Sequence, residues 1–492
     1  MTIVVCRLYF GLRDAGYKSI MVNCNPETVS TDFDLADRLY FEPITFEDIM
    51  NIIDFEKPDG VLVQFGGQTP LKIANQLTEA GVKLFGTSAN NINLAENREE
   101  FAKIIKKLNV LTPQYCIAKN YEDIYGYAES AHFPVLVRPS FVLGGRAMQI
   151  VYSKEQLVDY VFRSAEATND HPILIDQFIE NAFEFDVDAL SDGENVFVAG
   201  IMQHIEEAGV HSGDSSCVIP PYEMSDSVKK DIEDITTKLA LELNVIGLIN
   251  LQFAVKDQKV YVLEVNPRSS RTVPFVSKYS NIPLASIAAQ ISVGKKITDF
   301  NLQKNNFEHI AVKKAVLPFK KFKNEKVFLG PEMKSTGEVM GIDSNIGSAF
   351  LKAMRSDGYM VPKTGTAFLS VNDSDKPRLL SIASKLIKLG FNLIATKGTY
   401  AFLNSNNIEC NEIYKVGEGR PNVVDEILND NIQIVINSPE GPQSRFDEEA
   451  IGRTSVMKNV LTITTIPGAK AAIDSMKHLN EVSVKALQEY FE

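Results

Sequence analysis

The sequence predicts an α/β protein with about three units, of which the last is a doubly wound domain. Helix and strand patterns alternate through residues 4–85 and again from Gly365 onward, which is typical of doubly wound domains. Strand patterns dominate the region between them. The length of 492 residues fits this division, because one domain usually takes ~150 residues.

The composition is that of an ordinary globular protein with an excess of acidic groups. Hydrophobic residues make up 45% and charged residues 23%, and the formal net charge is −13. This charge argues against sequence-independent binding to nucleic acid, whose phosphates require a basic surface. No stretch approaches the ~20 apolar residues of a membrane helix, and no secretory signal pattern opens the chain.

The cysteines are scattered and odd in number: Cys6, Cys24, Cys116, Cys217 and Cys410. No C-x-x-C pair occurs, so neither a zinc site nor a disulfide framework is indicated. Free thiols are typical of a reducing compartment, and we expect a cytoplasmic protein with no nucleic-acid or membrane partner.

The first unit, predicted over residues 1–88, reads as a Rossmann-like domain. We expect helices at 4–16, 46–55 and from Pro70, and strands at 19–23 and 60–63. A glycine turn at 65–69 follows the second strand, at the edge where such sheets bind ligands. No strand or glycine-rich turn precedes the first helix, so the domain is predicted to be truncated at its start.

The second unit, predicted over residues 89–296, begins with an amphipathic helix at 97–108 that carries Arg98. Strands are expected at 134–140, 149–152 and 173–180. Gly144 and Gly145 lie in a loop between the first two of these strands, where backbone N–H groups can approach phosphate oxygens. An ordinary hairpin turn is the alternative.

Residues 183–190 alternate strictly, with acidic side chains on one face. This pattern indicates a sheet with one solvated face or, in an adenine nucleotide site, Glu184 as acceptor for the ribose hydroxyls. A polar glycine loop at 209–215 carries His211, which in isolation reads as an ordinary loop histidine.

The most informative stretch is a predicted hairpin formed by residues 252–255 and 260–267. Alternation places Glu264 and Asn266 on one face, and Gln252 can lie opposite them on the partner strand. These oxygen ligands suit Mg²⁺. Arg268 and Arg271 follow at the strand exit, where they can meet a phosphoryl group. A hairpin edge with solvated polar side chains is the alternative.

Beyond a helix at 283–294, we expect a connecting region over residues 297–360 and a third unit over 361–492. Strands are predicted at 367–371, 392–395, 412–416 and 432–436, with a helix at 376–390. The segment from Thr396 to Thr399 reads as a phosphate cradle near a helix start, or as a polar β-turn.

Several long motifs together resemble the C-terminal half of the carbamoyl-phosphate synthase large subunit. They are M-V-N-C-N-P-E-T-V-S-T-D-F-D (21–34), R-L-Y-F-E-P (38–43), G-G-Q-T-P-L (66–71), V-R-P-S-F-V-L-G-G-R-A-M (137–148), G-V-H-S-G-D-S (209–215), E-V-N-P-R-S-S-R-T-V-P-F-V-S-K (264–278) and G-P-E-M-K-S-T-G-E-V-M-G (330–341). The resemblance runs in order through essentially the whole chain.

The resemblance implies a truncated pre-ATP-grasp domain, an ATP-grasp domain, an oligomerisation region and a methylglyoxal-synthase-like regulatory domain. It implies a ligase that phosphorylates carbamate with ATP, in arginine and pyrimidine biosynthesis. The nucleotide-binding residues implied are Arg98, Arg138, Gly144, Gly145, Gln177, Ile179, Glu184, Gly209, Val210, His211, Ser212, Gln252 and Glu264. Gln252, Glu264 and Asn266 would bind Mg²⁺ or Mn²⁺, and a K⁺ ion is expected nearby. Arg138, Arg268 and Arg271 would be catalytic.

In the regulatory domain the family binds nucleotide monophosphates such as UMP or IMP. The matching effector residues are Ser370, Lys376, Thr396, Thr399, Lys415 and Asn437. The resemblance also implies three kinds of partner: an N-terminal synthetase half, a glutaminase small subunit and further copies in an oligomer.

The chain departs from the family pattern at its start, which lacks the expected strand and glycine-rich turn, and in the absence of the preceding half. We therefore expect a split-gene product or a fragment. Lys314 stands where ornithine-regulated members carry a glutamate, and Pro439 replaces a hydroxyl residue. Two other functions remain open: a non-catalytic nucleotide-binding regulatory fragment, and a different ATP-grasp ligase such as a biotin-carboxylase-like enzyme.

Overall fold

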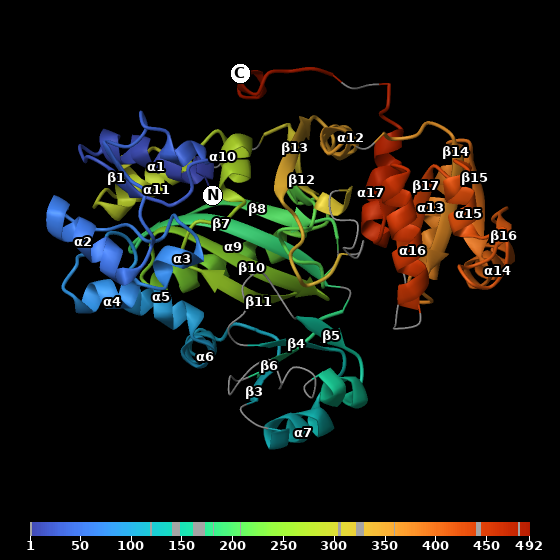
Figure 1. The fold of residues 1–492 in the computed structure, drawn as a ribbon, viewed down its shortest axis with the longest axis horizontal. Helices are drawn as coiled ribbons and strands as arrows, with labels where there is room; N and C mark the ends of the chain where they lie inside the picture. The colour runs from blue at the N-terminus through green and yellow to red at the C-terminus, as the bar shows by residue number, and fades with distance from the viewer. Residues whose placement is uncertain are drawn as a thin grey trace.

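The computed structural model describes residues 2–118, 121–139, 148–160, 173–180, 182–206, 208–303, 307–320, 329–358, 360–438, 444–480 and 483–492. Within these residues the strands form sheets of two, seven, five and four strands. Figure 1 shows the first unit at one end of the molecule, the seven-stranded sheet in the middle and the five-stranded sheet at the other end. The described part contains no helix that is both long and apolar enough to cross a membrane.

The first unit is a small α/β domain. Its helices are α1 (Thr2–Asp14), α2 (Phe46–Glu56), α3 (Gln68–Leu71), α4 (Ala74–Glu79) and α5 (Ala89–Glu96), and its parallel strands are β1 (Ile20–Val22) and β2 (Arg38–Tyr40). The expected strand at 60–63 is wrong, because Val61 makes only a single bridge to Leu84. The strand pairing does not continue to Gln64. Its carbonyl accepts from the Ser269 N–H, and its side-chain amide donates to the Pro267 carbonyl.

The first unit is packed tightly onto the second. At Gly11 of α1, an added Cβ would lie 2.2 Å from the carbonyl oxygen of Ser286, so only glycine permits this approach to α11 (Leu284–Ser292). Val4, Leu8 and Leu12 of α1 share a buried core with α11 and α10 (Val273–Ser280). This contact fixes the first unit against the segment that follows the predicted metal-binding hairpin.

The second unit is built on a seven-stranded sheet in the order β11-β10-β7-β8-β9-β12-β13, in which every described pair of neighbouring strands is antiparallel. Its strands are β7 (Phe183–Asp192), β8 (Val196–His204), β9 (Cys217–Ile219), β10 (Ile246–Lys256), β11 (Lys259–Asn266), β12 (Ile310–Val316) and β13 (Gly337–Asp343). The helix α9 (Asp226–Glu242) packs Val228, Ile232 and Leu239 against the apolar side chains of β7, β8 and β10. Residues 297–360, expected as a connecting region, therefore contribute β12 and β13 to this sheet, followed by α12 (Ile346–Ser356).

A four-stranded antiparallel sheet lies beside the β10–β11 edge of the large sheet (Figure 1). It contains β3 (Tyr115–Ala118), β6 (Ile173–Gln177), β4 (Val135–Pro139) and β5 (Gln149–Val151), and α7 (Tyr121–Ser130) packs against it. The preceding helix α6 (Arg98–Lys107) packs Phe101 and Ile105 into the core of the seven-stranded sheet. The predicted strands at 134–140, 149–152 and 173–180 are present here. The chain enters this sheet after pairing Leu111 with Tyr261 of β11.

The third unit is a five-stranded parallel sheet with helices on both faces, as predicted. The strand order β16-β15-β14-β17-β18 comprises β14 (Gly365–Val371), β15 (Phe391–Thr396), β16 (Asn411–Ile413), β17 (Ile434–Ser438) and β18 (Leu461–Ile463). The helices are α13 (Lys376–Lys388), α14 (Lys397–Ser405), α15 (Val423–Leu428), α16 (Ser444–Met457) and α17 (Ile466–Met476). Ala367 and Leu369 share a core with α13 and α17, whereas Phe368 faces the core of α15 and α16.

The C-terminal residues link the third unit back to the second. The segment 483–492 returns to the seven-stranded sheet (Figure 1), where the Tyr490 hydroxyl donates to the Ile342 carbonyl at 3.1 Å. The rings of Tyr490 and Phe491 lie 5.4 and 5.3 Å from the ring of buried His309. His309 in turn bonds the carbonyl of Tyr279, at the end of α10.

A buried carboxylate ties α10 to the sheet. Asp188 of β7 is fully buried and accepts hydrogen bonds from Ser270 at 2.7 Å, Thr272 at 2.6 Å and Asn250 at 3.0 Å. Burial raises the pKa of Asp188 to about 6, although these donors oppose the shift. The bonds from Ser270 and Thr272 fix the path of the chain between β11 and α10, and the bond from Asn250 joins Asp188 to β10.

We expect the Tyr490→Ala/Phe491→Ala double variant to lose about 1–3 kcal/mol of stability, because each aromatic pair contributes roughly 0.5–1.5 kcal/mol beyond its burial. The loss is measured as a shift of the urea unfolding midpoint. The matched control is Val484→Ala in the same segment, because Val484 is 100% exposed. A double variant as stable as this control would contradict the contact.

We expect Asp188→Asn to change how stability depends on pH. The folded-state pKa of Asp188 lies above the ordinary 3.8, at about 6. The protonated carboxyl therefore makes its full contribution to the stability of the wild-type fold below about pH 4. This stabilisation is lost as the pH rises through about 6. The variant should gain about 3 kcal/mol relative to wild type between pH 4 and pH 7, as read from urea unfolding at each pH.

Asp192, on the same strand, provides a control of opposite sign. Burial raises the pKa of Asp192, but the N–H groups of Ile297, Asn195 and Glu194 outweigh burial and lower it overall. The wild-type stabilisation by this group is complete above the ordinary pKa of 3.8 and is lost as the pH falls through the lower folded pKa. Asp192→Asn should therefore lose stability relative to wild type as the pH rises toward about 4, and should change little between pH 4 and pH 7. The same trend in both variants would refute the assignment for Asp188.

Candidate nucleotide and metal site

The central feature of the site is a polar face that crosses three neighbouring strands. The register pairs Gln252 of β10 with Glu264 of β11 on one side and with Asp186 of β7 on the other. The next row pairs Asn250 with Asn266 and with Asp188. Directly opposed residues share a face of the sheet, so all six side chains point the same way.

The predicted convergence of Gln252, Glu264 and Asn266 is therefore confirmed as geometry. Glu264 is exposed, Gln252 is half-buried and Asn266 is 8% exposed. The Gln252 amide nitrogen donates to the Ser212 hydroxyl at 2.9 Å, which leaves its amide oxygen as a ligand. Two amide oxygens and a carboxylate are hard donors, and this set fits Mg²⁺.

Two arginines leave the end of β11 beside this face. One terminal nitrogen of Arg268 donates to the Asn266 side-chain oxygen at 3.0 Å and the other to the Ser269 carbonyl at 3.2 Å. Its Nε is buried without a hydrogen-bond partner. Arg271 is exposed, with Nη1 3.1 Å from the sulfur of Met333, a weak acceptor.

The other two predicted arginines, Arg98 of α6 and Arg138 of β4, meet at one carboxylate of the smaller sheet. Asp176 of β6 lies 2.9 Å from Nη2 of Arg138 and 3.9 Å from Nη2 of Arg98. The Nε of Arg138 is buried and unpartnered, like that of Arg268. The sequence pattern did not single out Asp176, because a lone aspartate in a buried strand has no recognisable spacing to either arginine.

The predicted nucleotide loops lie next to each other. The Ala208 N–H donates to the Ala182 carbonyl at 3.2 Å, which joins the loop at 209–212 to the chain after Gln177 and Ile179. Gly209 has φ +109°, and an added Cβ would lie 3.0 Å from the ring of Phe178. Val210 follows it and is half-buried. Gly144 and Gly145 lie outside the described residues.

His211 is held in a fixed position in this loop. Its backbone N–H donates to the Gly330 carbonyl at 2.7 Å, and its ring Nδ1 accepts from the backbone N–H of Gly213 at 3.0 Å. Burial lowers the pKa of His211, against the opposing effect of Asp214. A neutral ring with Nδ1 as acceptor has its proton on Nε2, where it can donate to a ligand.

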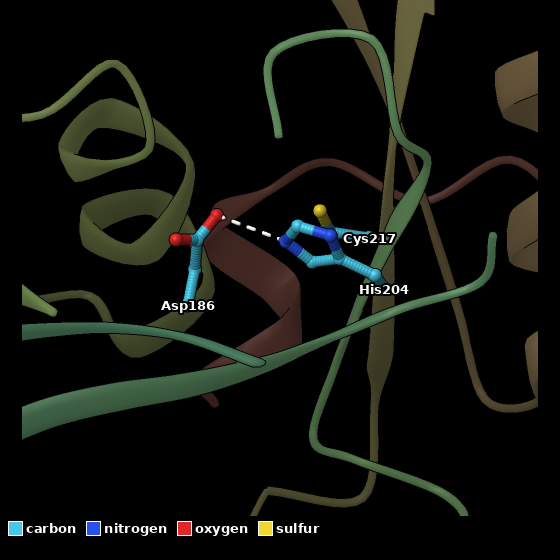
Figure 2. A group of neighbouring side chains, drawn as sticks. All are labelled: Asp186, His204 and Cys217. Atoms are coloured by element: carbon cyan, nitrogen blue, oxygen red, sulfur yellow. Dashed lines mark hydrogen bonds and ion pairs between the residues drawn. The ribbon is translucent and has the colours of Figure 1, made fainter. Parts of the chain in front are cut away.

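Sequence reasoning missed a buried ionic group beneath Glu184. His204 of β8 contacts Glu184 and Asp186, and Cys217 of β9 lies beside it (Figure 2). Asp186 and Asp188 are 3% and 0% exposed, so the alternative of a solvated face on this strand is wrong. No motif spacing could reveal the group, because it joins residues of three strands.

Asp186, His204 and Cys217 are residues of the kinds that bind metal ions, and their potential ligand atoms lie within 4.8 Å of one another. Lys313 of β12 pairs directly with Cys217 and is 1% exposed. Burial lowers the pKa of Lys313, but Cys217, Glu338 and Asp186 outweigh it and raise the pKa overall. A buried ammonium therefore already supplies positive charge here, which favours an ionic network over a metal centre.

Two further residues near this polar face carry no sequence signal. Gln64 is 1% exposed and donates to the Pro267 carbonyl at 2.7 Å, which holds the strand exit. Glu96, at the end of α5, has its pKa raised by burial and lowered by nearby Arg268. Both belong to the N-terminal part of the chain, far from the hairpin in sequence.

In the third unit, most of the predicted effector residues meet at the carboxyl ends of the strands. Ser370 pairs with Asn437, and the Thr396 hydroxyl donates to the Ser370 hydroxyl at 3.2 Å. The Thr399 hydroxyl accepts from the Val371 N–H at 3.3 Å. Thr396 also begins α14 without a side-chain cap, so the first N–H groups of that helix point toward this corner.

The two predicted effector lysines differ in position. Lys376 lies close to this corner, since a Cβ added at Gly398 would be 3.5 Å from its ammonium group. It pairs with Asp373 at 2.6 Å. Lys415 lies beyond β16, and its N–H donates to Glu418. Pro439 lies outside the described residues.

Lys314 lines a pocket between the second and third units, together with Glu206, Asp214 and Thr465. Its ammonium group lies 2.7 Å from Asp357. Glu206 accepts from Ser215 and Ser216, and Asp214 accepts from the N–H groups of Lys334 and Ser335. Both carboxylates therefore have protein donors.

Each of the three units matches the model of a known protein family. Residues 5–94 match the carbamoyl phosphate synthase preATP-grasp domain, residues 97–300 match the carbamoyl-phosphate synthase L chain ATP binding domain, and residues 378–464 match the MGS-like domain. These matches confirm the predicted fold class. The exact domain boundaries remain a prediction.

Solved structures show the same ATP-grasp fold at low sequence identity. The biotin carboxylase domain of Hydrogenobacter thermophilus 2-oxoglutarate carboxylase, in complex with MgADP, ADP and bicarbonate, is 16% identical. It superposes with a TM-score of 0.59 over 72% of this chain and 87% of that chain. At this identity the likeness concerns the fold alone.

Similarity to curated proteins is much higher. The carbamoyl phosphate synthase large chain of Archaeoglobus fulgidus is 53% identical over 487 residues, which are 98% of this chain and 45% of that protein. The chain thus spans about half the length of such relatives. The carbamoyl phosphate synthase large chain, C-terminal section, of Aquifex aeolicus is 49% identical, over 98% of this chain and 94% of that one. The chain belongs to the carbamoyl phosphate synthase large-chain family.

Proposed function

We propose that this chain phosphorylates carbamate with ATP to give carbamoyl phosphate and ADP. The observation that carries the proposal is the pairing of Gln252 with Glu264 on a face that also holds Asn266, with Arg268 and Arg271 at the strand exit. Membership of the family supplies the substrate. The product would enter arginine and pyrimidine biosynthesis.

Carbamate is a weak anionic nucleophile, so its phosphorylation depends on positioning and charge neutralisation more than on a strong base. Gln252, Glu264 and Asn266 would hold Mg²⁺, which neutralises the phosphate oxygens when it is bound. Arg268 is fixed by its bonds to Asn266 and Ser269, so its charge needs little reorganisation. Arg271 is exposed and contacts the sulfur of Met333, a weak acceptor, so it can turn toward an anion.

The nucleotide would lie between the two sheets of the second unit. Arg138 is fixed by Asp176 and would face the phosphates, whereas Glu184 would accept from the ribose hydroxyls. Gln177, Ile179 and the loop at 209–212 would contact the remainder of the nucleotide. Carbamoyl phosphate hydrolyses readily, so exclusion of water should matter as much as charge. The glycines at 144 and 145 are assigned to the covering loop by the resemblance.

The proposal includes partners and ions that the family implies. An N-terminal synthetase half would supply carbamate, and a glutaminase subunit would supply ammonia to that half. Mn²⁺ could replace Mg²⁺, and K⁺ would bind near the nucleotide. The third unit would bind a nucleotide monophosphate such as UMP or IMP, with Thr396 and Thr399 at its phosphate. We place this oligomeric enzyme in the cytoplasm.

The reaction is tested in reverse, without a carbamate supply. The chain given ADP, Mg²⁺ and carbamoyl phosphate should form ATP, and Glu264→Ala should lower the rate on the order of 10²–10³-fold by removing charge stabilisation. Glu194→Ala is the control, because this exposed carboxylate lies on the β7–β8 turn and pairs with Lys296. No ATP above the Glu264→Ala background would refute catalysis and favour a regulatory fragment.

The effector site is tested by calorimetric titration with UMP and with IMP. Thr396→Val keeps the side-chain shape but removes a hydroxyl that would bind phosphate, so affinity should fall about tenfold or more. Thr366→Val is the control, because Thr366 lies at the opposite end of the neighbouring strand β14. Equal affinities in the two variants would exclude this corner as the phosphate site.

A further inference from the structure

A histidine lies directly beneath the carboxylate that would receive the ribose. His204 is the last residue of β8 and follows Gln203, which pairs with Phe185, so it stands opposite Glu184. Its Nε2 forms a hydrogen bond with an Asp186 oxygen at 3.0 Å. Its Nδ1 lies 3.3 Å from a Glu184 oxygen, close enough for an ion pair but without hydrogen-bond geometry. One ring therefore lies between two acidic residues on the same face of β7, and Figure 2 shows its contact with Asp186.

The position of this ring is strongly constrained. The side chains of His204 and Asp186 are only 2% and 4% exposed, whereas 15% of the Glu184 side chain remains exposed. Burial lowers the pKa of His204, but Cys217, Asp186 and Glu184 outweigh it and raise the pKa well above its ordinary value. A protonated imidazole carries a positive charge, so it attracts the carboxylate on each side, through a hydrogen bond to Asp186 and an ion pair with Glu184.

The contact leaves one part of Glu184 available. A single oxygen of Glu184 is placed against His204, and 15% of the Glu184 side chain remains exposed. A carboxylate has two oxygens and several acceptor positions, so a donor behind it selects one orientation. A free glutamate would have to lose rotational freedom when a ligand binds.

We propose that His204 is a positioning residue for nucleotide selection, which holds Glu184 so that the carboxylate accepts from the hydroxyls of a ribose. This inference rests on the proposed nucleotide site. It predicts selectivity for ribonucleotides over sugars without those hydroxyls, set by a residue that does not touch the ligand. Asp186 acts on the opposite side of the ring and fixes its plane.

Two amide substitutions separate the two contacts. The amide nitrogen of glutamine takes the place of Nε2, so His204→Gln keeps a donor for Asp186 and removes the one for Glu184. The amide nitrogen of asparagine takes the place of Nδ1, so His204→Asn keeps the donor for Glu184. The control is His309→Gln, another buried histidine, which contacts Tyr279 and the C-terminal rings.

The experiment measures the affinity of each variant for MgADP and for Mg-2′,3′-dideoxy-ADP by calorimetry, so it needs no turnover. The wild-type chain and His309→Gln should prefer ADP by about tenfold or more, since hydrogen bonds to a carboxylate are lost with the hydroxyls. His204→Gln should reduce this preference to within about threefold with dideoxy-ADP affinity unchanged. His204→Asn should retain most of the preference.

The opposite results overturn the inference. If His204 has a merely structural role, His204→Gln will weaken the binding of ADP and of dideoxy-ADP equally. An unchanged preference for ADP over dideoxy-ADP in this variant would show that Glu184 does not need His204 to hold it. Ribose selectivity that depends on His204, without ATP formation from carbamoyl phosphate, would refute the proposed reaction and leave the positioning role standing. No binding of ADP to the wild-type chain would refute both.

Discussion

The structure depends on the register of three antiparallel strands. Gln252 of β10 pairs with Glu264 of β11 and with Asp186 of β7, and Asn250 pairs with Asn266 and with Asp188, so these six polar side chains share one face. A slip of one residue in any of these ladders would turn that strand's polar set into the apolar core behind it. The hairpin turn at Asp257 and Gln258, both with positive φ, helps to fix this register.

The chain beyond the hairpin is held by contacts from distant parts of the sequence. Gln64 binds Pro267 and Ser269 from the first unit, and Asp188 binds Ser270 and Thr272 from the neighbouring strand. Each of these contacts closes a long loop of chain, so the path of the arginine-bearing segment is decided only when all the units have packed. The rigidity of the site is therefore a property of the whole molecule.

Much of the site could be predicted from alternation alone. The acidic face of β7, the glutamine on β10 and the glutamate and asparagine on β11 all follow from a period of two along each strand. The solvated alternative for β7 failed because alternation identifies a face but cannot tell what covers it. His204, Cys217 and Lys313 cover part of that face, and they come from three strands that share no spacing in the sequence.

The sequence by itself determined the three-unit α/β organisation, the hairpin, the parallel regulatory sheet and the family. These features follow from local periodicity, turn residues and long motifs, which are written along the chain. Tertiary structure alone decided that Gln64 supports the strand exit, that Asp176 joins Arg98 to Arg138 and that His204 stands beneath Glu184. Such pairings arise from the order and register of strands far apart in sequence, and short-range propensity carries no information about them.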